Sequence, residues 1–259
     1  MAADALLESR ASDSVWGVRV TPADLADATN LVVSRGLAGT GGYACFCNVH
    51  VLVTAQHSEP LRSALDAAAV VFADGWPVAR LQRGAGVSAA ERIAGADLME
   101  RVFAVGQASG LRHFLFGSTP TVLDRLRQRL LRRFPDTRIV GALAPAMAAA
   151  PPGKLGGLAE IRAARPHLVW CALGAPKQEL WMRECADSLA PAFVLGVGAA
   201  FDFLAETNRR APQLVQDAGL EWLHRLLCEP RRLAGRYLRT NAEFTGRVLF
   251  ESLRRRLAK

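Results

Sequence analysis

The sequence predicts an α/β fold, with a mainly parallel sheet, helices on both of its faces, and a basic helical C-terminal appendage. Short apolar runs alternate with segments of helical spacing from Val15 to Phe203, a pattern that is typical of βαβ units. From Pro212 onward the spacing is helical only. With 259 residues, of which 51% are hydrophobic and 22% charged, the chain is long enough for one large α/β domain, or for a domain with an appendage.

Each expected element follows from its own local pattern. Strands are expected in the short apolar runs bounded by turn residues, at 15–20, 43–47, 70–73, 111–116, 138–143, 168–173 and 192–197. Helices are expected in the amphipathic segments between them, at 21–36, 49–56, from 60, 92–108, 121–133 and from 176. A polar connector is expected at 80–90 and a loop at 144–157. Alternation of this kind gives a Rossmann-like sheet.

The distribution of charge suggests two domains. The formal net charge is +8, and from Arg209 onward twelve basic residues stand against five acidic ones, a balance of +7. The first 208 residues hold the remaining 20 basic and 19 acidic residues. We therefore expect a catalytic α/β domain at 1–208 and a basic helical appendage at 209–259 that binds a membrane or a lipid diphosphate.

Several classes of protein are not expected. The N-terminus lacks the pattern of a signal peptide, and no apolar run reaches about 18 residues, so we expect neither export nor a spanning helix. The five cysteines are odd in number and mostly lie in apolar runs, which is typical of reduced thiols in a cytoplasmic protein. Cys45 and Cys47 share one face of a strand, but no further ligands follow at matching spacing, so no metal is expected.

Residues 169–184, with the sequence VWCALGAPKQELWMRE, are the most informative stretch. A buried strand is expected to break at Gly174 and to lead into a helix that presents Lys177, Gln178 and Glu179 on its first turn. In open α/β sheets ligands bind beyond the carboxyl ends of the strands, where helix N-termini offer free N–H groups. These residues are therefore candidates for substrate binding, with an ordinary surface turn as the alternative.

Other strand ends carry further candidates. Asp74-Gly75 places a carboxylate at the end of a strand, where it either caps the next helix or acts chemically. Gly117 begins a Gly-Ser-Thr junction that either holds a phosphate or caps a helix. Gly198 permits close approach of a ligand, and Asp202 follows it. No GxGxxG motif occurs in a βαβ setting, which weakens the alternative of a nicotinamide-dependent oxidoreductase.

The C-terminal segment alternates arginines with apolar and aromatic residues, and Pro230 divides it into at least two helices. Basic amphipathic helices of this kind bind membrane surfaces or polyphosphates. The alternatives are a helix packed on the sheet with a solvated arginine face, and a non-catalytic basic module that docks on anionic lipid or nucleic acid.

Seven motifs of the chain, in the order in which they occur here, resemble the WecG/TagA/CpsF glycosyltransferase family, also called glycosyltransferase family 26. They are Asn48 with Val49-His50; Ala73-Asp74-Gly75 with Pro77-Val78; Arg92-Ile93-Ala94-Gly95-Ala96-Asp97-Leu98; Gly174-Ala175-Pro176-Lys177-Gln178-Glu179 with Trp181; Gly196-Val197-Gly198 with Phe201-Asp202; Arg210-Ala211-Pro212; and Gly219-Leu220-Glu221-Trp222 through Tyr237.

The resemblance implies a bacterial enzyme that transfers a sugar from a UDP-sugar to a polyprenyl-diphosphate-linked saccharide, with inversion and without a metal or other cofactor. It implies that Asp74 is the general base and that Arg92 and Gln178 lie in the active site. It further implies that motif residues bind substrate, including Asn48, Gly95, Arg210, Arg225, Arg231 and Arg236. Phe46 stands where members often carry a threonine, which leaves the identity of the sugar open.

The chemistry of the residues agrees with this expectation. Inverting transfer needs one base for the incoming hydroxyl and positive groups for the departing diphosphate. No Asp-x-Asp pair is present to hold a divalent ion, whereas arginines are abundant. Asp74 is the best-placed carboxylate, with Asp202 and Glu179 in reserve. We expect a protein on the inner face of the cell membrane that does not bind nucleic acid; a homo-oligomer remains possible.

Overall fold

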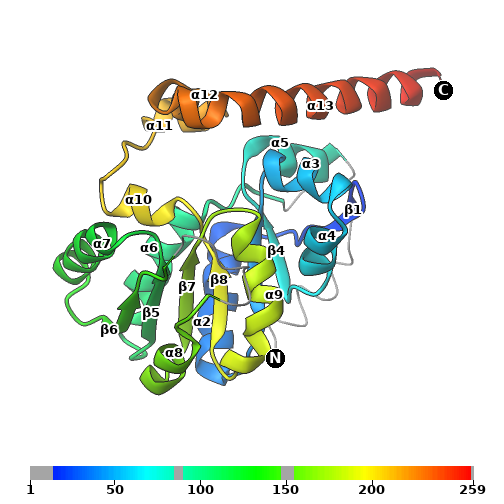
Figure 1. Cartoon of the computed structure of the whole chain (residues 1–259). Coiled ribbons are helices and arrows are strands. Elements are labelled where there is room, and N and C mark those ends of the chain that lie inside the picture. The colour runs from blue at the N-terminus through cyan, green and yellow to red at the C-terminus, as the bar shows by residue number, and fades with distance from the viewer. Residues whose placement is uncertain (1–13, 85–89, 147–154, 258–259) are drawn as a thin grey trace.

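The computed structural model describes residues 14–84, 90–146 and 155–257, and its centre is a six-stranded parallel sheet (Figure 1). The strands lie in the order β4-β3-β8-β7-β5-β6. Their bounds are Tyr43–Cys47 for β3, Val70–Ala73 for β4, Arg112–Gly117 for β5, Arg138–Leu143 for β6, Leu168–Ala172 for β7 and Phe193–Gly196 for β8. The predicted α/β class and parallel sheet are confirmed.

Helices cover both faces of the sheet and form two separate cores, since side chains of successive strand residues point to opposite faces. One core includes Phe46, Trp170 and Leu195, and the other includes Cys45, Cys171 and Val194. Three longer helices cover the first core, α2 (Leu25–Ala38), α6 (Gly95–Gly106) and α7 (Pro120–Arg133), together with the short α10 (Ala200–Leu204). The second is covered by α3 (Val49–His57), α4 (Glu59–Asp66), α5 (Trp76–Gly84), α8 (Leu158–Ala164) and α9 (Lys177–Leu189).

The prediction that residues 15–20 form a strand of this sheet is wrong. It is instead a small antiparallel hairpin of β1 (Ser14–Val15) and β2 (Val18–Arg19). Trp16 and Gly17 between them have φ angles of 52° and 81°. Two successive residues with positive φ form the tight turn that suits a two-residue hairpin.

Two other expectations change in detail. The expected connector at 80–90 belongs in part to α5, and residues 85–89 lie outside the described part. The expected loop at 144–157 is followed by α8, which the sequence did not suggest, and residues 147–154 also lie outside the described part.

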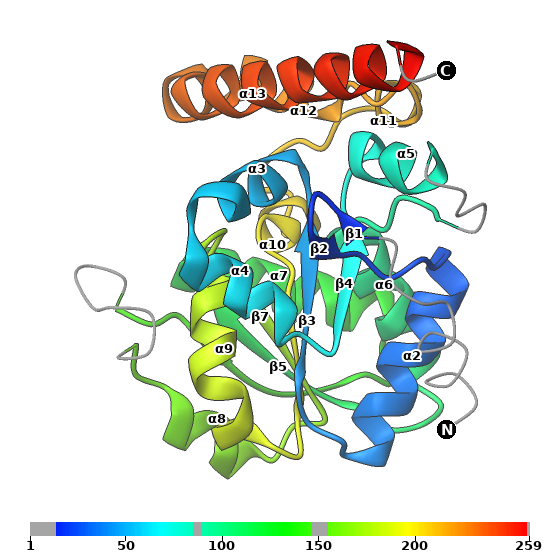
Figure 2. The same cartoon turned by 90° about the vertical axis from the view of Figure 1, so that its right-hand side faces the viewer.

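The C-terminal segment is helical, as expected, and begins a new helix at Pro230. It consists of α11 (Gln213–Asp217), α12 (Glu221–Cys228) and α13 (Pro230–Leu257). In both views these helices lie across one end of the α/β domain, above α3 and α5 (Figures 1 and 2). Helix α13 packs on α3, where His57 pairs with Glu243 at 2.6 Å and Arg247 donates to Gln56 at 2.9 Å.

Candidate active site

All strands of the main sheet are parallel, so their carboxyl ends meet at one edge, which we call the carboxyl edge. Asn48 follows β3 at this edge, Asp74 follows β4, and Gly198 lies two residues after β8. The structure therefore brings these three candidates to the same edge. Their geometry decides what each can do.

Asp74 is half-buried and held against the end of β3. Asn48 caps α3, because its Oδ1 accepts a hydrogen bond from the backbone N–H of Val51 at 3.1 Å. The cap leaves the amide nitrogen of Asn48 to donate to Oδ2 of Asp74 at 3.4 Å. The backbone N–H of Asp74 donates to the carbonyl of Cys47 at 2.9 Å. Among the described residues, the Asp74 carboxylate makes no hydrogen bond to the first turn of α5, so the alternative of a helix cap is not supported.

Arg92 lies beside Asp74 because the segment before α6 is fastened to the end of β4. The backbone N–H of Ile93 donates to the carbonyl of Ala73 at 2.8 Å. The Arg92 guanidinium forms an ion pair with Oε2 of Glu221, the first residue of α12. Only 12% of the Arg92 side chain and 19% of the Glu221 side chain are exposed, so the pair is little screened by water.

Arg210 joins the same group of charges from the segment before α11. Both of its terminal nitrogens bond the carboxylate of Asp97 on the first turn of α6, the second at 2.8 Å. Its Nε lies 3.7 Å from Oε1 of Glu221. We call Asp74, Arg92, Asp97, Arg210 and Glu221 the charge cluster. The cluster joins the carboxyl edge to the C-terminal segment.

Burial and the neighbouring charges determine the direction in which the pKa of Asp74 is shifted. Burial raises the pKa of the Asp74 carboxyl above its ordinary value, the Arg92 guanidinium opposes this shift, and the carboxylate of Glu221 adds to it. The hydrogen bond from Asn48 and the charge of Arg225 also lower the pKa. An ionised carboxylate whose pKa is raised in this way is a better acceptor for the proton of a hydroxyl group.

Gln178 ties together the turns that follow β7 and β8. Its Nε2 donates to the carbonyl of Gly196 at 2.7 Å and to Oε1 of Glu179 at 2.9 Å, while its Oε1 accepts from the N–H of Gly174 at 3.2 Å. The side chain is 4% exposed. In this structure Gln178 holds the shape of the carboxyl edge rather than presenting a free amide. Lys177, one residue earlier, is exposed.

Glu179 lies beneath the carboxyl edge. It is 0% exposed, and its Oε2 has no hydrogen-bond partner among the described residues. Burial raises the pKa of the Glu179 carboxyl to about 7, although the hydrogen bond from Gln178 opposes the shift. We correct the expectation that Glu179 binds substrate directly or serves as a reserve base, because substrate has no access to it here.

Two of the candidate glycines have a packing role. A Cβ on Gly117 would lie 2.6 Å from the main-chain carbon of Ala172, so only glycine permits this approach of β5 to β7. A Cβ on Gly95 would lie 3.2 Å from Val197, which follows β8. Both glycines are buried, and we correct the expectation that they contact substrate. Gly75 and Gly198 are partly exposed at the edge.

The remaining candidates lie in or near the C-terminal segment. The guanidinium of Arg225 lies 5.3 Å from the ring centre of Phe203 on α10. Asp202, also on α10, accepts a hydrogen bond from the hydroxyl of Thr207 at 3.4 Å, so it shapes the following turn. Arg231 is exposed on the first turn of α13. The side chain of Arg236 lies outside the described part of the structure.

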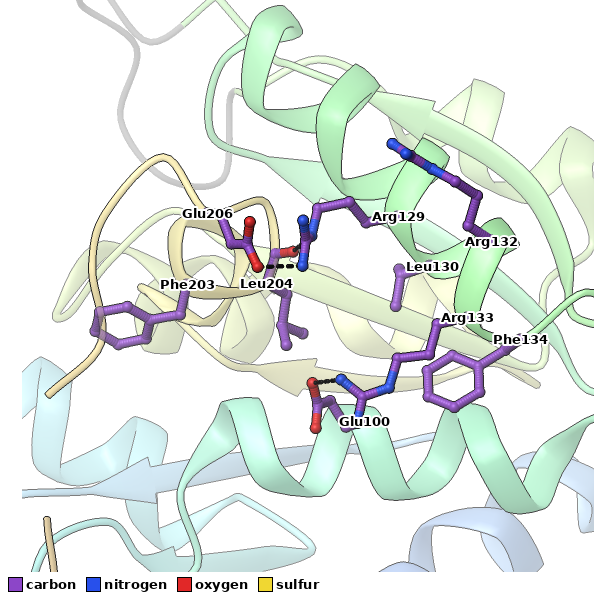
Figure 3. A pocket seen from close by; sticks show the side chains of 9 residues that line it. All are labelled: Glu100, Arg129, Leu130, Arg132, Arg133, Phe134, Phe203, Leu204 and Glu206. Atoms are coloured by element: carbon purple, nitrogen blue, oxygen red, sulfur yellow. Dashed lines mark hydrogen bonds and ion pairs between the residues drawn. The ribbon is translucent and has the colours of Figure 1, made fainter. Parts of the chain in front are cut away.

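A separate cavity of about 350 Å³ lies between α6, α7 and the end of α10 (Figure 3). Arg129, which pairs with Glu206, and Arg133, which donates to Glu100 at 2.7 Å, both line it. None of the residues of the charge cluster lines this cavity. A third arginine of the cavity, Arg132, donates to the carbonyl of Gln128 at 3.3 Å, and we assign the cavity no part in the reaction.

Among the described residues, no three His, Cys, Asp or Glu side chains form a group that could hold a metal ion. Within the same residues, no helix is both long enough and apolar enough to cross a membrane.

Comparison with known families gives the site its context. The model of the family described as Glycosyl transferase WecG/TagA/CpsF family matches residues 14–258. The chain belongs to this family. It is therefore a glycosyltransferase of polysaccharide biosynthesis, and membership of the family implies a nucleotide-sugar donor and a lipid-linked acceptor.

Within this glycosyltransferase, the sequence had not singled out two residues of the charge cluster. Asp97 and Glu221 occur in the motifs of the resemblance, but no role was expected for them. Local sequence spacing does not predict the contact between Glu221 and Arg92, because the two residues are 129 positions apart. The available signal for Glu221 was an acidic residue at the start of a helix in a segment with a large excess of basic residues.

Proposed function

We propose that the chain is an inverting glycosyltransferase that transfers a hexose or N-acetylhexosamine-type sugar from a UDP-sugar to a polyprenyl-diphosphate-linked saccharide in the synthesis of a bacterial surface polysaccharide. The observation that carries the proposal is the position of Asp74, at the carboxyl edge, bonded by Asn48 and flanked by Arg92. This arrangement offers one base beside one cation, which is what a single displacement requires.

In the proposed reaction, Asp74 takes the proton of the acceptor hydroxyl while that oxygen forms a bond to the anomeric carbon. The bond from that carbon to the diphosphate oxygen breaks, and UDP leaves with the bonding electrons. Arg92 and Arg210 stabilise the charge that develops on the diphosphate, a task that a metal ion performs in other transferases. Gln178 keeps the turns beneath the reacting groups in place through its three hydrogen bonds.

The test is an assay of the purified protein with a panel of UDP-hexoses and UDP-N-acetylhexosamines, a polyprenyl-diphosphate-linked acceptor and EDTA. We expect release of UDP, together with a glycosylated lipid, from at least one donor, at a rate that EDTA does not lower. A panel without any turnover would refute the proposed donor class. Activity that depends on added magnesium or manganese would refute the role given to the arginines.

We further propose that residues 209–259 form the appendage that places the enzyme on an anionic membrane. The large apolar side chains most exposed on α13 are Leu238, Leu249, Phe250, Leu253 and Leu257, which are 59% to 87% exposed. The last three leucines recur every four residues, so they form one stripe. Leu233 and Phe244, on another side of the helix, are 0% exposed and partly buried, respectively.

Replacing Leu249 and Leu253 together with glutamine is expected to weaken binding to vesicles that contain phosphatidylglycerol by about tenfold or more, because two apolar side chains no longer enter the bilayer interface. Glutamine preserves the helix. Co-sedimentation with vesicles measures the effect. The matched control replaces Leu37 and Leu131, exposed leucines of α2 and α7, with glutamine. This variant should bind the vesicles as the wild type does. Equal binding by both double variants would contradict the proposed surface.

A further inference from the structure

Glu221 bridges two arginines of the charge cluster. One of its carboxylate oxygens pairs with Arg92, and the other lies 3.7 Å from Nε of Arg210. All three side chains are largely buried, with 12% to 23% of each exposed. The carboxylate of α12 thus provides two anionic oxygens, each facing a different guanidinium.

The guanidinium of Arg210 is fixed in place and has one donor, Nε, without a hydrogen-bond partner among the described residues. Asp97 binds both of its terminal nitrogens, which fixes the plane of the guanidinium. Its Nε is buried and has no hydrogen-bond partner among the described residues, since Glu221 lies beyond hydrogen-bond distance. A buried donor without an acceptor is costly, and an anionic oxygen placed closer than that of Glu221 would satisfy it.

We propose that Glu221 is an internal substitute for the diphosphate of the substrate: it occupies the anion position between Arg92 and Arg210 in the free enzyme and leaves when a diphosphate binds. This inference rests on the proposed function, which supplies the diphosphate. A diphosphate also offers pairs of anionic oxygens and carries more charge than one carboxylate, so it competes effectively for two guanidinium groups.

The exchange links substrate binding to the position of the C-terminal segment. Other contacts also hold that segment against the α/β domain. The Trp76 indole N–H donates to the carbonyl of Gln216 at 2.8 Å, the Asn208 amide donates to Glu229 at 3.1 Å, and Arg225 lies over Phe203. Loss of the Glu221 pair removes one attachment and leaves the others, so α12 shifts relative to the edge while the segment stays docked.

The test compares the binding of inorganic diphosphate by the wild type and by Glu221→Gln, in isothermal titration calorimetry at one ionic strength. The variant keeps the shape of the side chain and removes its charge. We expect it to bind diphosphate at least about fivefold more tightly, because the internal competitor has lost the charge that pairs it with Arg92 and faces Arg210. Glu243→Gln, which removes a paired carboxylate on α13 at a distance from the cluster, should bind as the wild type does.

Hydrogen exchange provides a second measurement. Diphosphate should speed exchange in residues 221–228 of the wild type, whereas Glu221→Gln should exchange faster there before any ligand is added. Unchanged or weaker binding of diphosphate by Glu221→Gln would overturn the proposal, since a carboxylate that merely orients the arginines predicts weaker binding.

The two proposals fail in different ways. If the wild type releases UDP from a donor but Glu221→Gln does not bind diphosphate more tightly, the inference about Glu221 is wrong and the proposed function stands. If no donor is turned over but the variant still binds diphosphate more tightly, the anion position stands and the proposed reaction is wrong.

Discussion

Replacing Asp74 with asparagine is expected to lower the rate of sugar transfer by a factor of about 10² to 10⁴, the usual contribution of a general base. Asparagine has the same shape, and the side-chain oxygen that remains still accepts the hydrogen bond from Asn48. The amide cannot take a proton from the acceptor hydroxyl. Affinity for UDP and the melting temperature should therefore change little, because neither depends on that proton.

The measurement is kcat with a saturating UDP-sugar and lipid acceptor, alongside titration with UDP. Asp187→Asn, an exposed carboxylate on α9, is the matched control and should retain full activity. Wild-type turnover should also fall as the pH is lowered through the raised pKa of Asp74, because the base must be ionised. Full activity of Asp74→Asn would remove Asp74 from the role of base.

Replacing Glu179 with glutamine is expected to abolish a pH-dependent loss of stability. The pKa of Glu179 is about 7 in the folded protein, against an ordinary value of 4.5. Between these values the folded state holds a proton that the unfolded state has lost, so the free energy of unfolding falls as the pH rises. The loss amounts to about 3 kcal/mol and is complete above pH of about 7. The glutamine side chain does not titrate.

Urea denaturation at several pH values between about 4.5 and 8 measures this effect. The stability of Glu179→Gln relative to the wild type should rise by about 3 kcal/mol across that range, whatever constant cost the substitution carries. Other titrating groups act equally on both proteins and cancel. Glu184→Gln, an exposed residue of the same helix, should give a curve parallel to that of the wild type. Parallel curves for Glu179→Gln would show that the burial of Glu179 does not shift its titration.

Much of the fold follows from the sequence, because buried parallel strands are short, continuous apolar runs. Residues 43–47 and 168–173 are of this kind, and both form central strands. The prediction of a single strand at 15–20 was wrong because Trp16 and Gly17 form a turn, which apolar periodicity does not reveal. Helix α8, at 158–164, was missed because a Gly- and Pro-rich stretch precedes it and hid its short pattern.

The candidate site was only partly predictable. Asp74 could be chosen because a carboxylate followed by glycine at a strand end has a defined place at the carboxyl edge. Whether Gln178 and Glu179 point outward depends on the rotation of α9 about its axis, which the turn at Gly174 fixes. The contacts of Glu221 depend on how α12 docks, and no local pattern encodes docking over 129 residues.

Because the six strands run in the same direction, the two ends of the sheet differ in what they carry. All six strands end at one pole of the molecule, where the groups proposed to react and the C-terminal helices also lie (Figures 1 and 2). The opposite pole, where the strands begin, contributes none of these groups. Attachment to a solid support through that pole would leave the reactive pole facing outward, so an immobilised enzyme could still meet a lipid carrier embedded in a bilayer.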